Sequence, residues 1–131
     1  IPVNAMLAPI IPGINSHEIM NLAKAVSENG ASSFAFTVVR LNGPIGEIFT
    51  DWIKKAMPDK AEKVLHQIQS CHNGSLNNSR FGIRSRGEGK IATQIHDLMR
   101  LAKHKYFRDK SFPKLNTELH EQFKQGQMRL F

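Results

Sequence analysis

Residues 3–41 decide the fold and read VNAMLAPIIPGINSHEIMNLAKAVSENGASSFAFTVVRL. Residues 3–10 are apolar at odd and even positions alike, which is typical of a strand buried on both faces by helices. Residues 33–41 are rich in aromatic and β-branched side chains and predict a second strand. A helix is expected between them, ending at Asn29 and Gly30. A strand, helix, strand unit places its strands in parallel, so the predicted fold class is α/β.

The helix between the strands carries a start signal and an apolar stripe. Asn15 and Glu18 have the spacing of a capping box, in which each side chain binds the backbone amide of the other residue. We therefore expect the helix to begin at Asn15. Its predicted buried stripe consists of Ile19, Leu22, Ala23 and Val26.

Three further helical patterns follow the second strand. The first has the predicted buried residues Ile45, Ile48, Phe49, Trp52 and Ala56. The second begins at Asp59, with Glu62 as its capping-box partner, and is expected to bury Ala61, Val64, Leu65 and Ile68. Residues 74–89 contain glycines and adjacent asparagines and predict an irregular loop. A third helix over residues 88–106 is expected to bury Ile91, Ile95, Leu98, Ala102 and Tyr106.

The charge of the chain is concentrated in its second half. Residues 1–70 contain six Lys/Arg and six Asp/Glu, whereas residues 71–131 contain twelve and five, which accounts for the net charge of +7. A positive surface of this kind favours a nucleic-acid partner, because phosphate neutralisation is strong and independent of sequence. A basic surface that only keeps the protein in solution is the alternative.

Cysteine usage and hydropathy place further bounds on the protein. Cys71 is the only cysteine, so an internal disulfide is excluded and a reducing, cytoplasmic compartment is expected. His66, Cys71 and His72 fall short of a tetrahedral zinc set, so no metal site is predicted, and the histidines are expected at the surface. No apolar segment reaches the length of a membrane span, and no membrane partner is predicted. The start at Ile1 leads us to expect a piece of a longer protein.

Two segments are candidates for a binding site. Ligands of α/β proteins bind where parallel strands end, because loops and helix N-termini converge there. Residues 9–15 follow the first strand and contain two prolines and a glycine that stiffen the turn. Residues 39–43 follow the second strand and include Arg40, whose planar guanidinium suits a carboxylate or phosphate. A merely rigid turn and an Arg40 paired with a local acid are the alternatives.

Three segments in this order resemble one known family. MLAPIIPGINSHEI at residues 6–19, VRLNG at residues 39–43 and NNSRFGIRSRGEG at residues 77–89 are similar to the C-terminal part of radical S-adenosylmethionine proteins. Among these proteins, the segments are most similar to the group that contains spore photoproduct lyase and related DNA-repair proteins. The resemblance implies the βαβ end of a partial, TIM-like (β/α) barrel over residues 1–107, followed by a polar tail over residues 108–131.

The resemblance also implies cofactors for the parent protein. Members of the family hold a [4Fe-4S] cluster with a C-x-x-x-C-x-x-C motif, which this sequence lacks, and cleave S-adenosylmethionine to a radical. By the same likeness, Pro12, Gly13 and Ile14 are expected to contact the adenosine of that cofactor, and Arg40 its carboxylate or the substrate. We expect no catalytic residue and no bound cluster in this part of the protein.

The loop over residues 74–89 is a candidate nucleic-acid site. Arg80, Arg84 and Arg86 alternate with Phe81 and Ile83, which offers donors to phosphates beside a ring for stacking. The alternative is that the two apolar residues fix the loop to the body of the protein while the arginines remain solvated.

The last five residues resemble a docking peptide. Gln127, Met128, Leu130 and Phe131 are similar to the peptide by which bacterial DNA-processing proteins bind the replication sliding clamp. The alternative is that Leu130 and Phe131 pack against the core of the chain itself.

The resemblance to this family implies the C-terminal part of a radical S-adenosylmethionine, iron–sulfur enzyme with a lyase or repair activity on nucleic acid, and the positive charge of the second half is in keeping with such a substrate. The chain alone is not expected to be active. The alternative function is a non-catalytic module that binds nucleic acid or the sliding clamp, and a plain interaction domain is a third. Unpaired strand edges make a homodimer plausible.

Overall fold

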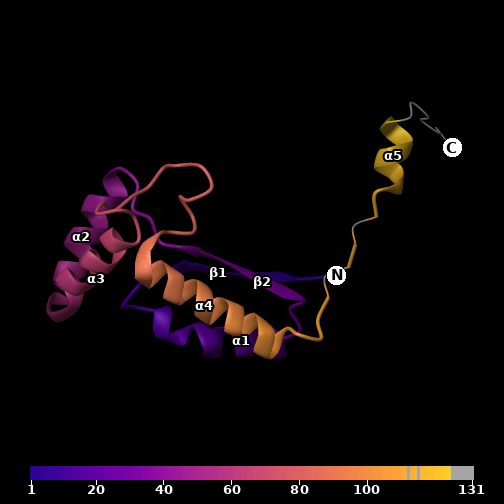
Figure 1. The fold of residues 1–131 in the computed structure, drawn as a ribbon, viewed down its shortest axis with the longest axis horizontal. Coiled ribbons are helices and arrows are strands. Elements are labelled where there is room, and N and C mark those ends of the chain that lie inside the picture. Colours follow the sequence, from indigo (N-terminus) through magenta and orange to yellow (C-terminus); the bar gives the residue numbers. More distant parts are fainter. Residues whose placement is uncertain (112, 115, 125–131) are drawn as a thin grey trace.

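The computed structural model describes residues 1–111, 113–114 and 116–124. Its elements are β1 (Asn4–Ile10), the short 3₁₀ helix η1 (Ser16–Glu18), α1 (Ile19–Glu28), β2 (Ser33–Val38), α2 (Pro44–Ala56), α3 (Pro58–Ser70), α4 (Gly89–Tyr106) and α5 (Glu118–Lys124). Figure 1 shows α1 and α4 side by side along the strands, with α2 and α3 gathered where the strands end. The predicted α/β class is confirmed.

The two strands pair in parallel, as the βαβ pattern predicts. Asn4 lies opposite Ser33 and Leu7 opposite Phe36, but the next partners are Ile10 and Val38. β1 therefore has one residue more than β2 between these pairs, which is a β-bulge at residues 8–9. The bulge lies near the carboxyl ends of the strands, which is where parallel sheets usually bind ligands.

One face of the sheet is packed and the other is open, so the expectation of a strand buried on both faces is wrong. The packed face belongs to the larger core cluster, which comprises Leu7, Ile10, Ile19, Ala23, Ala31, Phe34, Val38, Cys71, Ala92, Ile95, Met99, Ala102 and Phe107. Met6 lies next to Leu7 in β1, so its side chain belongs to the opposite face of the sheet, where it is 61% exposed. Among the described helices, α1 and α4 supply the apolar cover for the packed face, whereas α2 and α3 pack beyond the strand ends.

A second core cluster lies between α2, α3 and the segment after β2. Its buried residues are Val39, Leu41, Ile53, Ala61, Val64 and Ile68. The predicted buried face of α2 holds only for Phe49, which packs against this cluster. Ile53 is fully buried instead, whereas Ile45, Ile48, Trp52 and Ala56 are exposed. Apolar residues occur on more than one side of this helix, and the side facing α3 becomes the core.

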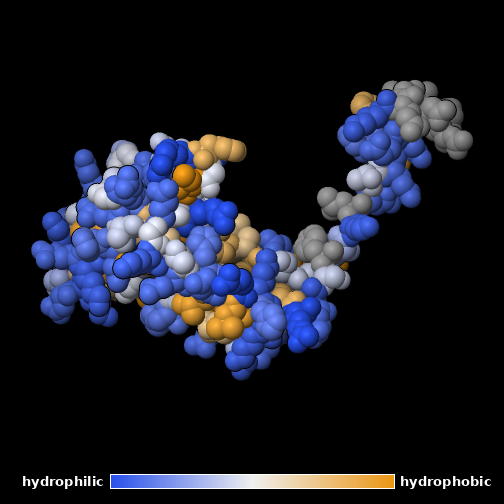
Figure 2. All heavy atoms as spheres, in the orientation of Figure 1, coloured by the Kyte–Doolittle hydropathy of each residue, from blue (hydrophilic) through white to orange (hydrophobic). Residues whose placement is uncertain are grey.

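Two other apolar stripes differ in part from the prediction. Leu22 of α1 and Leu98 of α4 are partly exposed, whereas Met99 is buried in the core. Leu22, Leu98 and Leu101 are apolar residues of the outer surface, and Figure 2 shows hydrophobic atoms gathered over α1 and α4. The two helices contact one another, and both contribute residues to the core cluster under the sheet, so each stripe is turned partly toward its neighbour.

The helix starts also differ from the capping patterns. Asn15 does not cap a helix with its side chain: its Oδ1 accepts from the Ile11 amide at 2.7 Å, and its Nδ2 donates to the Pro9 carbonyl at 3.0 Å. The side chain thus closes the turn after β1, and the regular helix begins only at Ile19. α3 begins at Pro58, and no side chain caps it.

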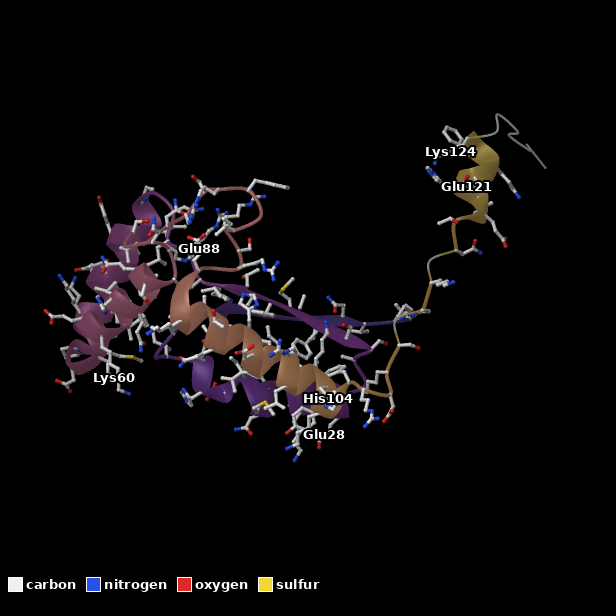
Figure 3. All side chains as sticks on the ribbon, viewed as in Figure 1. Glu28, Lys60, Glu88, His104, Glu121 and Lys124 are labelled. Carbon is white, nitrogen blue, oxygen red and sulfur yellow. The ribbon has the colours of Figure 1, made fainter. Side chains whose placement is uncertain are left out.

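The tail contains α5, which has no buried residue and lies apart from the remainder in Figure 1. Glu121 and Lys124 form an ion pair on this helix at 3.9 Å (Figure 3). The candidate docking peptide at residues 127–131 lies outside the described residues. No described helix combines the length and the apolar composition needed to cross a membrane.

Candidate functional site

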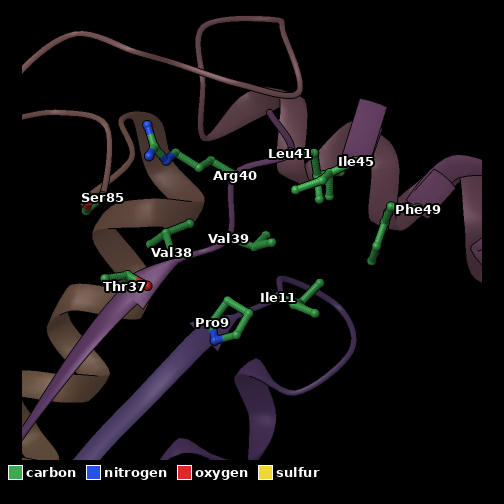
Figure 4. A pocket seen from close by; sticks show the side chains of 10 residues that line it. All are labelled: Pro9, Ile11, Thr37, Val38, Val39, Arg40, Leu41, Ile45, Phe49 and Ser85. Atoms are coloured by element: carbon green, nitrogen blue, oxygen red, sulfur yellow. The ribbon is translucent and has the colours of Figure 1, made fainter. Parts of the chain in front are cut away.

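An open pocket of about 350 Å³ lies where β1 and β2 end. It is lined by Pro9, Ile11, Thr37, Val38, Val39, Arg40, Leu41, Ile45, Phe49 and Ser85. Pro9, Ile11, Val39, Ile45 and Phe49 surround its apolar side in Figure 4. The position agrees with the expectation that the carboxyl ends of the strands form the site.

Backbone hydrogen bonds hold the walls of this pocket. Beyond the bulge, the Val39 amide donates to the Ile10 carbonyl at 2.9 Å and so extends the strand pairing. The Leu41 amide donates to the Leu76 carbonyl at 2.9 Å, and the Val38 amide donates to the Ser85 carbonyl at 3.0 Å. The end of β2 is therefore fixed on both sides, and its side chains extend from a defined backbone.

Arg40 supplies the positive charge of the pocket. It is half-buried, and none of the ion pairs among the described residues involves it. In Figure 4 its side chain extends away from Ile45 and Phe49, on the side of Ser85. The alternative of a local acidic partner therefore does not apply within the described chain, and the guanidinium is available to an anion at the rim.

His72 supports the pocket from behind. Its ring is buried, and Nε2 donates to the Val39 carbonyl at 2.6 Å, since a carbonyl oxygen can only accept. Its Nδ1 has no hydrogen-bond partner among the described residues. The expectation that the histidines lie at the surface is wrong for His72, because the turn after α3 carries it beneath the end of β2.

Pro12, Gly13 and Ile14 do not line this pocket. Pro12 is fully buried, and Ile14 packs against the second core cluster. Gly13 has φ of +76° and lies so close to Gln67 that a Cβ would be 2.5 Å from Oε1. Pro12 and Gly13 line a separate hollow of about 220 Å³.

Pro9 and Ile11 belong to the candidate segment at residues 9–15 and do line the pocket, whereas sequence reasoning missed Ile45 and Phe49. Ile45 and Phe49 could be found only from the rotation of α2, which the apolar pattern left open.

The loop between α3 and α4 comprises residues 71–88, and its three arginines have different surroundings. Arg80 is paired with Glu88 at 2.6 Å and also contacts Asn78. Glu88 lies at the start of α4 (Figure 3), so the ion pair holds the loop there. Phe81 is 90% exposed, and the Arg84 guanidinium lies 5.7 Å from the centre of its ring. The alternative that Phe81 fixes the loop to the body is wrong, because that ring stands in solvent. Arg86 lies on the other side of the loop, beside α4.

The described residues do not fit an iron–sulfur cluster. Cys71 is the only cysteine of the chain, its thiol is buried, and burial raises its pKa, which disfavours the thiolate that iron requires. Within residues 1–111, 113–114 and 116–124, no three His, Cys, Asp or Glu side chains gather in a way that could hold a metal ion.

The pocket at the strand ends offers two matches to an adenosyl ligand with a carboxylate. A flat adenine ring suits the wall formed by Ile11, Val39 and Phe49, and a carboxylate suits the half-buried Arg40. Comparisons of the chain with protein families, with curated proteins and with solved structures found no match.

Proposed function

We propose that the pocket at the ends of β1 and β2 binds S-adenosylmethionine, and that the chain is the C-terminal part of a radical S-adenosylmethionine enzyme. One observation carries this proposal: a half-buried Arg40 without an acidic partner among the described residues lies at the rim of a pocket whose other lining residues are apolar apart from Thr37 and Ser85. A buried or half-buried cation favours an anionic ligand, because its desolvation is otherwise uncompensated. The volume of about 350 Å³ lies at the lower end of the range for ligand pockets.

The residues of this chain would bind and orient the cofactor. Arg40 would hold the carboxylate through its two parallel N–H groups, while Ile11 and Phe49 would exclude water from one side of the adenosine. When bound to a reduced cluster held by another part of the parent protein, the cofactor supplies a 5′-deoxyadenosyl radical. The proposed reaction is abstraction of a hydrogen atom from a nucleic-acid substrate, in a lyase or repair activity.

Calorimetry with S-adenosylhomocysteine measures binding to the pocket with a ligand that does not react. Because a charge-assisted hydrogen bond contributes about 1.5–3 kcal/mol, Arg40→Ala should weaken binding about tenfold to a hundredfold. Adenosine lacks the carboxylate, so its affinity should be the same for both proteins. The exposed Arg108 provides a control, and Arg108→Ala should change neither ligand. If Arg40→Ala lowers the affinity for both ligands equally, or for neither, the proposed role of Arg40 is wrong.

A second candidate function is binding of single-stranded nucleic acid by the loop. The observation that favours it is the exposed Phe81 ring with the Arg84 guanidinium beside it. A ring of this kind stacks on any base, and an adjacent cation neutralises phosphate. Fluorescence anisotropy with a labelled oligothymidylate should show affinity that falls with salt, and Arg84→Ala should reduce the slope of log K against log salt by about 0.7. An unchanged slope would remove Arg84 from the contact.

Binding to the sliding clamp remains a proposal for residues 127–131, which lie outside the described part of the chain. A variant that ends at Gly126 should lose capture by immobilised clamp, whereas the full chain should be retained. Equal retention of the two would exclude the peptide. Size-exclusion chromatography of the same two proteins tests the proposed homodimer.

A further inference from the structure

A basic groove lies between β2 and α4, next to the pocket at the strand ends, and Ser85 lines both. It consists of two adjoining hollows of about 340 and 360 Å³. Both are lined by Phe36, Arg86, His96 and Lys103, and one of them is also lined by Arg100. We call these five residues and the space between them the β2–α4 groove.

One face of α4 delivers three of these residues. His96, Arg100 and Lys103 are four and then three residues apart, which places them on one side of a helix. Met99 lies between them in the sequence and is buried in the core. The packing of Met99 therefore fixes the rotation of α4, and the three basic residues border the groove together.

Arg86 extends from a part of the loop whose backbone is held by hydrogen bonds. The Ser85 carbonyl accepts from the Val38 amide at 3.0 Å, and the Arg86 carbonyl accepts from His96 Nε2 at 2.9 Å. Two consecutive residues of the loop are thus bound, one to β2 and one to α4. His96 acts here as a positioning residue, because its hydrogen bond holds the backbone from which Arg86 extends.

The groove carries an excess of positive charge. Arg100 is paired with Asp97 at 3.0 Å, and Asp97 is the only carboxylate among the lining residues. Neither Arg86 nor Lys103 takes part in an ion pair among the described residues. The Lys103 ammonium instead lies 5.6 Å from the centre of the Phe34 ring, which keeps it near the sheet.

The floor of the groove is aromatic. Phe36 is half-buried and lies edge to face with the His96 ring, with the centroids 5.0 Å apart. An aromatic floor beside two cations that have no acidic partner in the described part of the chain matches a ligand that joins a flat ring to a phosphate. A volume of about 350 Å³ in each hollow suits one unit of such a ligand.

We propose that the β2–α4 groove is a nucleotide site, in which Arg86 and Lys103 bind the phosphate and Phe36 contacts the base or sugar. The nucleotide is either free or one unit of a nucleic-acid strand. This proposal does not depend on the adenosyl ligand at the strand ends or on the Phe81 loop tip, because it rests on different side chains.

Calorimetry with thymidine 5′-monophosphate, thymidine, inorganic phosphate and an eight-residue oligothymidylate tests the proposal on the full chain. The monophosphate should bind more tightly than thymidine or phosphate alone, because both halves of the ligand make contacts. A comparable affinity for the monophosphate and the oligonucleotide would identify a free nucleotide as the ligand. At least tenfold tighter binding of the oligonucleotide would identify a strand.

The double variant Arg86→Gln/Lys103→Gln should weaken binding of the monophosphate at least about tenfold. The control Lys90→Gln/Lys105→Gln removes the same charge from α4 outside the groove and should change the affinity less than about twofold. Arg40→Ala should leave this affinity unchanged, which separates the groove from the pocket at the strand ends. Equal losses in the two double variants would show non-specific attraction and overturn the proposal, as would the absence of binding to the unmodified protein.

Amide shifts of the unmodified protein keep the proposal testable if the double variant fails to fold. Titration with the monophosphate should shift the amides of residues 34–36, 85–87 and 96–103. Shifts confined to other residues would place the ligand elsewhere and overturn the assignment.

Discussion

The orientation of α2 can be tested by comparing two isoleucines on the same helix. Ile53 is fully buried in the second core cluster, whereas Ile48 is 67% exposed. Each substitution by Ala removes the same three carbon atoms. At Ile53 the substitution removes the favourable burial of these atoms and also leaves a cavity in the core. The free energy of unfolding should therefore fall by about 3 kcal/mol, within the usual range of about 2–5 kcal/mol. Ala has the higher helix propensity, which offsets a few tenths of a kcal/mol in both variants.

Urea unfolding measures this difference. With a typical urea dependence of about 1.5 kcal/mol per molar, Ile53→Ala should lower the midpoint by roughly 2 M, whereas Ile48→Ala should change the unfolding free energy by less than about 0.5 kcal/mol. Trp52 is the only tryptophan and lies on α2, so its fluorescence reports this helix while far-UV circular dichroism reports all of them. Coincident transitions would support a single two-state step.

The outcome distinguishes the structure from the apolar pattern alone. If Ile48→Ala costs as much as Ile53→Ala, then Ile48 faces the core and the described packing of α2 is wrong. The position of Phe49 in the pocket would then be wrong as well, because it depends on the same rotation of the helix.

Three further results are expected. Gly13→Ala should lower the unfolding free energy by about 1 kcal/mol more than Gly30→Ala, because both have positive φ but only the first Cβ would crowd the buried Val64, at 3.2 Å from its Cγ2; equal losses in urea unfolding would contradict this. Burial raises the pKa of Cys71, so the unfolded chain loses its thiol proton first and the unfolding free energy should fall as the pH rises above about 8.5, toward the raised pKa. Cys71→Ala should remove that decline, and a decline that persists would assign it to other groups. His72→Phe leaves the carbonyl at the end of β2 without its donor and should cost about 1–3 kcal/mol in the same assay, whereas an unchanged midpoint would show that this hydrogen bond contributes nothing.

The order of the elements could be predicted from local sequence. Asn29 and Gly30 end α1 as expected, and the parallel pairing of β1 and β2 follows from the single helix between them. Such signals are local, because a turn residue or an alternating apolar run acts on its own few neighbours.

The buried faces were harder to predict. α2 carries apolar residues on several sides, and α4 offers both Leu98 and Met99 to the core. Which of them is buried depends on the neighbouring helix rather than on the period of the pattern. Asn15 shows the same limit, since its side chain binds the turn after β1 instead of capping a helix.

One of the candidate sites could be predicted from the sequence and the other could not. Arg40 at the end of β2 follows from the rule for parallel strands, and the structure leaves it without an acidic partner among the described residues. The β2–α4 groove was not predicted, because Phe36, Arg86 and Lys103 are distant in the sequence. The spacing of His96, Arg100 and Lys103 was a local signal that could have indicated a basic helix face.

The division of the apolar core into two clusters has a consequence for local unfolding. One cluster joins the sheet to α1 and α4, and the other joins α2 to α3. We therefore expect each half to open as a cooperative unit of its own, with its own level of amide protection in hydrogen exchange. The pocket at the strand ends draws residues from both halves, since Pro9 comes from β1 and Phe49 from α2. A ligand that occupies it would suppress exchange in both units at once and couple their opening, although neither half contributes the whole site.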